Sequence, residues 1–137
     1  MISLSQFKQN LSFIETKINR AAQQAGTKAK DIKIVAVTKN FPPKIWKFSL
    51  ENNLCIIGEN QIREAENKTA RSYHRHKIEL HLIGHLQSNK ARKAIKYFDI
   101  LQTIDSIKLL NRINQISEEL NQKQKIFLQV NTGKDPN

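Results

Sequence analysis

Short apolar segments alternate with helix-like segments along almost the whole chain, and this alternation constrains the fold more than any other feature. The apolar segments predict five strands, at residues 34–37, 54–57, 78–83, 100–103 and 126–130. Helical patterns are predicted at residues 3–25, 44–52, 61–71, 88–97 and 105–120, with Ser3 and Asp105 as expected N-caps. Such alternation predicts a parallel sheet whose crossover connections are right-handed.

The first apolar segment, Ile34–Val37, is unbroken and predicts a strand that is buried on both faces. It ends at Lys39, and the prolines Pro42 and Pro43 prevent further strand pairing. A lysine is therefore expected at the carboxyl end of a buried strand, where the barrels of α/β proteins carry their chemistry. On this segment alone, the alternative that Lys39 only ends the strand and reaches solvent stays open.

The number of strands indicates part of a barrel. A closed eight-stranded barrel typically needs about 250 residues, whereas this chain has 137. A small doubly wound sheet is the alternative, but the sequence stops soon after a buried-type strand with no covering helix. We therefore expect residues 1–137 to form a single incomplete α/β domain, a partial TIM-type (β/α) barrel of about five parallel strands after an N-terminal helix. Its first and fifth strands would be unpaired edges, which favour self-association.

The composition is that of a globular protein, with 39% hydrophobic and 26% charged residues. We see no secretory signal and no apolar run of the roughly 18 residues that a membrane span needs. The single cysteine, Cys55, rules out an internal disulfide and suits a reducing compartment. We expect a cytoplasmic protein without a membrane partner, with Cys55 as a small buried hydrophobic residue.

The formal net charge of +11 raises nucleic acid as an alternative partner. The basic residues are spread along the chain, however, and no aromatic residues are interleaved with them. We interpret the charge as mainly solubilising, and a basic nucleic-acid-binding module stays as an alternative. The histidine pairs His74/His76 and His81/His85 lack a Cys, Asp or Glu that would complete a site, so no metal is expected.

Four strand ends and the fifth strand carry distinctive short segments. These segments are Ala36-Val37-Thr38-Lys39, Ile57-Gly58-Glu59-Asn60, His81-Leu82-Ile83-Gly84, Leu86-Gln87-Ser88-Asn89-Lys90, Gln102-Thr103-Ile104-Asp105 and Phe127-Leu128-Gln129-Val130-Asn131. Together they resemble the pyridoxal 5′-phosphate homeostasis protein family, relatives of the alanine racemase N-terminal barrel. The segment from His81 to Lys90 is the most specific, and the match extends in order over essentially the whole chain.

The resemblance implies that Lys39 holds pyridoxal 5′-phosphate as a Schiff base and that Asn60 lies close to the pyridoxal ring. His85 and Asn131 also follow strands, so all four side chains are expected on one rim of a parallel barrel. We take these four residues as the candidate cofactor-binding site. A Schiff-base lysine must be a free amine for part of the time, and Asn60 would orient the ring without adding a charge.

The chain departs from the family in two respects. Leu80 stands where an aromatic residue commonly precedes the signature histidine, here His81. Family members also continue for roughly three more strand–helix units, as a full barrel requires, and these carry the Ser- and Gly-rich turns that hold the cofactor phosphate. We therefore expect this chain to act in cofactor homeostasis without catalysis, and to bind the cofactor less tightly because those turns are missing. The alternatives are a racemase-like enzyme and a truncated fragment without function.

Overall fold

The computed structural model describes residues 3–133 of the chain. Within it the contacts gather into two compact units, one up to Ile34 and one from Val35 onward. The first unit contains helix α1 (Leu4–Gln24) and the short helix η1 (Ala29–Asp31). The prediction of a single domain over residues 1–137 stays a prediction, and each unit is described by itself.

Helix α1 confirms the first predicted helix and its predicted N-cap, Ser3. The Ser3 hydroxyl accepts a hydrogen bond of 3.1 Å from the amide of Gln6, which satisfies one of the amides that a helix start leaves unpaired. After the helix, Gly26 adopts a left-handed φ of +67°. Glycine reaches this conformation without steric cost, so the chain turns there.

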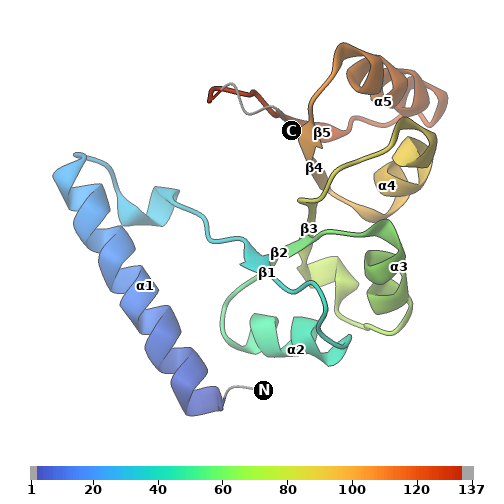
Figure 1. Cartoon of the computed structure of the whole chain (residues 1–137). Helices are drawn as coiled ribbons and strands as arrows, with labels where there is room; N and C mark the ends of the chain where they lie inside the picture. Colours follow the sequence, from blue (N-terminus) through green and yellow to red (C-terminus); the bar gives the residue numbers. More distant parts are fainter. Residues whose placement is uncertain (1–2, 134–137) are drawn as a thin grey trace. The chain divides into compact units, whose positions relative to one another are not determined.

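The second unit is built on a five-stranded parallel sheet (Figure 1). Its strands are β1 (Ala36–Val37), β2 (Ile56–Glu59), β3 (Glu79–Leu82), β4 (Ile100–Ile104) and β5 (Lys125–Leu128). They lie side by side in chain order. A doubly wound sheet would reverse its strand order partway, whereas a barrel wall adds each strand next to the last. The predicted partial barrel is therefore confirmed, and self-association through the β1 and β5 edges stays a prediction.

Four helices cover one face of this sheet (Figure 1). They are α2 (Lys44–Glu51), α3 (Ile62–Ala70), α4 (Ala91–Tyr97) and α5 (Ile107–Glu119), with the short helices η2 (Arg75–Lys77) before β3 and η3 (Ser88–Lys90) before α4. Within residues 3–133, none of the helices combines the length and apolar character needed to cross a bilayer.

The core lies between the sheet and these helices. Leu80 and Leu82 of β3 are both buried in it, together with apolar residues of all four helices. Because side chains alternate along a strand, the intervening His81 points to the other face of the sheet. The sheet thus has a helix-covered face and a second face, which in a barrel is the interior.

The structure corrects the prediction that the first strand is buried on both faces. Strand β1 has only two residues, and Val37 is half exposed. The reason is that the next residue, Thr38, bonds Glu59 on the helix-covered face, so Val37 points to the other face of the sheet, away from α2 to α5. An apolar run is suited to burial, but a strand is buried on both faces only where both faces of the sheet are covered.

Two local predictions were also wrong. Cys55 is exposed, because β2 begins one residue later and Cys55 lies in the connection that enters the sheet. The N-cap of α5 is Ser106 and not Asp105, since the Ser106 hydroxyl accepts a hydrogen bond from the amide of Leu109 at 3.3 Å. Asp105 instead pairs with His85.

Candidate functional site

The predicted site residues all follow strands, at the carboxyl-terminal edge of the sheet. Lys39 follows β1, Asn60 follows β2 directly, His85 follows β3 and Asn131 follows β5. Because the strands are parallel, these four residues share one rim. Lys39, Asn60 and His85 belong to three adjacent strands, whereas Asn131 belongs to the far edge of the described sheet.

Lys39 lies in a tight turn formed by Thr38, Lys39 and Asn40, here called the Lys39 turn. The turn is closed by a hydrogen bond of 3.2 Å from the amide of Phe41 to the carbonyl of Thr38. Asn40 has a left-handed φ of +65°, which asparagine tolerates better than most residues. Thr38 is buried while Lys39 is exposed, so the primary amine of Lys39 is accessible at the rim.

The ends of β2 and β3 approach each other closely beside Asn60. A Cβ atom added at Gly84 would lie 2.2 Å from the carbonyl oxygen of Asn60, so only glycine fits there. The carbonyl of Gly84 in turn accepts a hydrogen bond of 2.6 Å from the hydroxyl of Thr103 on β4. These contacts fix the backbones of three strand ends against one another and give this part of the rim a defined shape.

His85 provides an imidazole at the same rim. Its Nδ1 atom lies 3.3 Å from Oδ2 of Asp105, and 70% of its side-chain surface is exposed. The pair joins the turn after β3 to the turn after β4. His85 is therefore available to solvent and to a ligand at the rim while one ring nitrogen is oriented by the carboxylate.

A buried group of charged residues adjoins the Lys39 turn, and the sequence analysis did not identify it. The Lys68 ammonium donates hydrogen bonds to Oε1 of Glu59 at 2.7 Å and to Oε1 of Glu64 at 2.8 Å. Lys68 also donates to the carbonyl of Thr38 at 2.7 Å. The side chains of Lys68 and Glu59 are 2% and 0% exposed. We call Glu59, Glu64 and Lys68 the Lys68 cluster.

Further hydrogen bonds connect the Lys68 cluster to its surroundings. Oε1 of Glu59 accepts from the Thr38 hydroxyl at 2.5 Å and from the Trp46 indole at 3.2 Å. Oε1 of Glu64 accepts from the backbone amide of Asn40 at 2.6 Å. The sequence signal for this cluster was Glu59, which lies in the matching segment Ile57-Gly58-Glu59-Asn60 but was not given a role.

His81, part of the most specific matching segment, lies on the opposite face of the sheet from the helices. Its Nδ1 atom is 2.6 Å from the side-chain amide nitrogen of Gln102, and its Nε2 atom is 3.1 Å from Oε1 of Glu79. Its ring meets that of Phe127 edge to face at 6.5 Å. These contacts join β3, β4 and β5 across the interior face, so His81 supports the sheet and does not lie in the rim turns.

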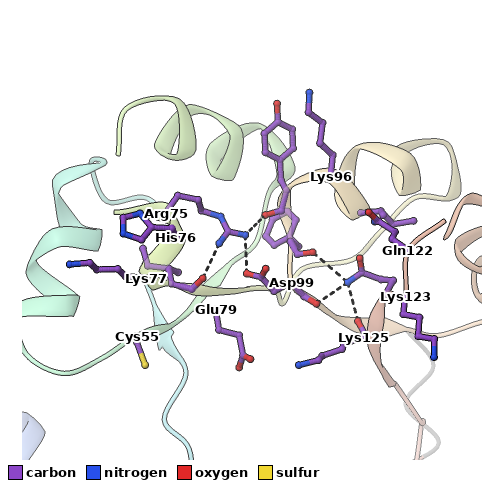
Figure 2. A pocket seen from close by; sticks show the side chains of 15 residues that line it. Cys55, Arg75, His76, Lys77, Glu79, Lys96, Asp99, Gln122, Lys123 and Lys125 are labelled. Carbon is purple, nitrogen blue, oxygen red and sulfur yellow. Dashed lines mark hydrogen bonds and ion pairs between the residues drawn. The ribbon is translucent and has the colours of Figure 1, made fainter. Parts of the chain in front are cut away.

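A basic hollow with a cavity volume of about 590 Å³ lies at the other end of the sheet (Figure 2). Residues that precede β2 to β5 line it, so it is at the amino-terminal ends of the strands, away from Lys39. The Arg75 guanidinium donates hydrogen bonds to Asp99 and to the carbonyls of Ile78 and Tyr97, at 2.8 to 2.9 Å. Figure 2 shows Arg75 pointing toward Asp99. Arg75 thus links the residue before β3 to the residues before β4.

A metal site was not expected, and His74, His76, His81 and His85 were the histidines considered for one. Among the residues that the structure describes, no three His, Cys, Asp or Glu side chains gather in a way that could hold a metal ion. The rim carries the exposed primary amine of Lys39, the amide of Asn60, and the imidazole of His85 beside the carboxylate of Asp105.

Comparison with known proteins places this geometry in a family. The alanine racemase N-terminal domain family matches residues 2–135. A pyridoxal phosphate homeostasis protein from Vibrio alginolyticus is 33% identical over 134 residues, which are 95% of this chain and 57% of that protein. The protein of the same name from Escherichia coli K12 is 33% identical over 112 residues, 77% of this chain and 46% of the relative.

Among solved structures, PipY of Synechococcus elongatus with PLP bound is 34% identical to this chain, with a TM-score of 0.75. The match covers 86% of this chain and 56% of PipY. The chain thus spans about half the length of the curated relatives that it matches. Because the family match extends over nearly all of its residues and the partial barrel agrees with it, the chain belongs to the alanine racemase N-terminal domain family.

Proposed function

We propose that this chain takes part in the homeostasis of pyridoxal 5′-phosphate in the cytoplasm, and that it holds the cofactor through a Schiff base on Lys39. The observation that carries the proposal is an exposed primary amine at the carboxyl-terminal rim of a partial barrel of this family. Two supporting findings are the names of the relatives and the PipY structure with PLP bound. When bound, the cofactor supplies an aldehyde that condenses reversibly with an amine.

The other rim residues are proposed to orient the ligand. Asn60 is half-buried and follows β2 directly, next to the strand that leads to Lys39, so its amide would contact a ring held there without adding charge. The close approach of Gly84 to Asn60 leaves this part of the rim with a fixed shape. His85, oriented by Asp105, and Asn131 would contribute further polar contacts at the rim.

We propose that this chain binds the cofactor with lower affinity than a longer relative does. The family resemblance attributes the phosphate contacts to Ser- and Gly-rich turns of later strands. The chain covers only 46% to 57% of the curated relatives named above. A Schiff base that lacks those contacts hydrolyses more readily, since the remaining attachment is one reversible bond.

Borohydride trapping tests the Schiff base on Lys39. The chain is mixed with pyridoxal 5′-phosphate, reduced and digested, and the labelled lysine is identified by mass spectrometry. We expect Lys39 to carry most of the label and Lys39→Ala to lose it. Lys44→Ala is the matched control, because Lys44 is an exposed lysine only five residues away. Label spread evenly over the lysines, or an equal loss in both variants, would contradict the proposal.

The proposed role is cofactor holding without catalysis. Racemase-like chemistry needs a second acid or base opposite the lysine. Tyr73 is 94% exposed, and Tyr97 bonds Glu66 and lines the hollow at the amino-terminal ends of the strands. Of these three candidates for the acid or base, Tyr73, Tyr97 and His85, the residue at the rim is His85. We expect no α-proton exchange of amino acids above that caused by free cofactor, and exchange that is lost in His85→Gln would support an enzyme instead.

A further inference from the structure

We propose that the Lys68 cluster positions Lys39: Glu59, Glu64 and Lys68 hold the backbone on both sides of Lys39, so that its amine stays at the rim. This inference rests on the proposed function, because it assigns the orientation of the amine that is to form the Schiff base. The three residues do not act on the ligand themselves. They are positioning residues that act through the Lys39 turn.

The sheet alone does not hold this turn. Strand β1 pairs with β2 through only Ala36 and Val37, and one further ladder-type bond joins the amide of Thr38 to the carbonyl of Gly58 at 3.0 Å. Lys39 comes after this last bond, at an edge strand. A loop tip with so few ladder bonds is expected to open locally unless other contacts hold it.

The Lys68 cluster fixes the residue before Lys39. The carbonyl of Thr38 accepts a hydrogen bond from Lys68, and the hydroxyl of Thr38 donates to Glu59. Both bonds are buried, so solvent does not compete for the partners. Thr38 is thereby attached to α3 through Lys68 and to β2 through Glu59.

The same cluster fixes the residue after Lys39. The amide of Asn40 donates to Glu64 on α3 at 2.6 Å, while Asn40 keeps the left-handed φ of +65°. With the carbonyl of Thr38 and the amide of Asn40 both attached to α3, the backbone of Lys39 has little freedom. The amine of Lys39 then moves only by rotation within its own side chain.

The hydrogen bonds of the Lys68 cluster also distinguish the roles of Lys68 and Lys39. The ammonium of Lys68 has three N–H donors, and its three partners are Thr38, Glu59 and Glu64. Lys68 is buried and fully engaged, whereas Lys39 is exposed. The same hydrogen bonds that occupy the Lys68 amine therefore hold the turn that presents the Lys39 amine.

A matched pair of variants on one helix tests the inference in the full 137-residue chain. Glu64→Ala removes the acceptor of the Asn40 amide. Glu66→Ala, two residues further along α3, removes the partner of Lys93 and Tyr97 and leaves the Lys39 turn untouched. Glu64→Gln is the rescue variant, because its side-chain oxygen still accepts from Asn40.

The first readout is amide hydrogen exchange of the chain without cofactor, measured by NMR. We expect Glu64→Ala to speed exchange at Asn40 about tenfold or more, because its amide loses its acceptor. Exchange in Glu66→Ala should stay unchanged at Asn40, and Glu64→Gln should restore most of the protection. Equal exchange at Asn40 in Glu64→Ala and the unmutated chain would overturn the inference.

The second readout is the equilibrium constant for Schiff-base formation, from the absorbance of the chain mixed with pyridoxal 5′-phosphate. We expect about a tenfold loss in Glu64→Ala, since a displaced reacting group loses its near-attack geometry, and at most a twofold change in Glu66→Ala. An equal loss in both variants would overturn the positioning role. If the unmutated chain forms no Schiff base on Lys39, the proposed function fails, while the exchange measurement still decides whether the cluster holds the turn.

Discussion

The Nζ atom of Lys68 lies 2.7 Å from Oε1 of Glu59, and both side chains are buried beneath the sheet. The pair joins helix α3 to strand β2. Removing both charges from water costs several kcal/mol per ion, and their attraction offsets that cost only when the remaining hydrogen bonds are also made. The bonds to Thr38, Glu64 and Trp46 meet part of that condition, whereas Oε2 of Glu59 is buried without a hydrogen-bond partner among the described residues.

Lys68→Met is expected to destabilise the chain by about 3–5 kcal/mol, because Glu59 is left buried without its counter-ion. The free energy of unfolding from urea titration measures the loss. Lys93→Met is the control, since Lys93 pairs with Glu66 at an exposed position, and such pairs contribute about 1 kcal/mol or less. Equal losses in the two variants would contradict a buried pair between Lys68 and Glu59 in the folded chain.

Gly84→Ala is expected to destabilise the chain by about 1–3 kcal/mol, because the new Cβ must displace backbone atoms of neighbouring strand ends. The clash is with the carbonyl of Asn60 at 2.2 Å. Gly133→Ala meets nothing within 4 Å and should be close to neutral. The same urea titration compares them, and a neutral Gly84→Ala would mean that the turn after β2 moves freely.

Ser106→Ala is expected to cost about 1 kcal/mol, the usual loss when an N-cap hydroxyl is removed. The hydroxyl of Ser106 accepts a hydrogen bond from the amide of Leu109 in the first turn of α5. Asp105→Ala keeps that cap and should cost clearly less, as it loses only the exposed pair with His85. A larger loss in Asp105→Ala, measured by thermal unfolding, would restore Asp105 as the residue that starts the helix.

Stability is expected to fall on the acid side of pH 4.5 partly through Glu66. Hydrogen bonds from Lys93 and then from Tyr97 hold the pKa of Glu66 below its ordinary value of 4.5. A carboxyl whose pKa is lower in the folded chain stabilises it above pH 4.5, and this contribution is lost as the pH falls through the folded pKa. The difference in unfolding free energy between the unmutated chain and Glu66→Gln should therefore shrink below pH 4.5.

The hydrogen bond from the Tyr97 hydroxyl to Glu66 also raises the pKa of Tyr97, because ionisation of the phenol would lose this bond and place two negative charges together. Ultraviolet titration of the phenol should show this pKa move down in Glu66→Gln. An unchanged titration in that variant would mean that the Tyr97–Glu66 hydrogen bond does not form in solution.

Much of the fold could be predicted from local sequence patterns. Strand–helix alternation predicted the parallel sheet, and all five strands and the five main helices lie near their expected positions. The rim positions of Lys39, Asn60, His85 and Asn131 followed from the same patterns, because a parallel sheet carries all strand ends to one edge. Their roles toward a cofactor stay a prediction.

What local patterns could not supply is the environment of each segment. Val37 was predicted to be buried but is half exposed, since its side chain points to the face of the sheet that α2 to α5 do not cover. Cys55 reads as part of an apolar strand but precedes it. Asp105 and Ser106 are both good caps, and only the backbone conformation selects Ser106.

The sequence by itself determined the alternation of strands and helices and the place of Lys39 after the first strand, because both depend on neighbouring residues. Only the tertiary structure decided that Lys68 reaches the Lys39 turn, since its partner Thr38 lies 30 residues away along the chain. In an isolated helix, Lys68 would be one more solvent-exposed, solubilising charge. It is buried because α3 packs that face against the sheet, where Glu59 and the carbonyl of Thr38 are the partners within reach.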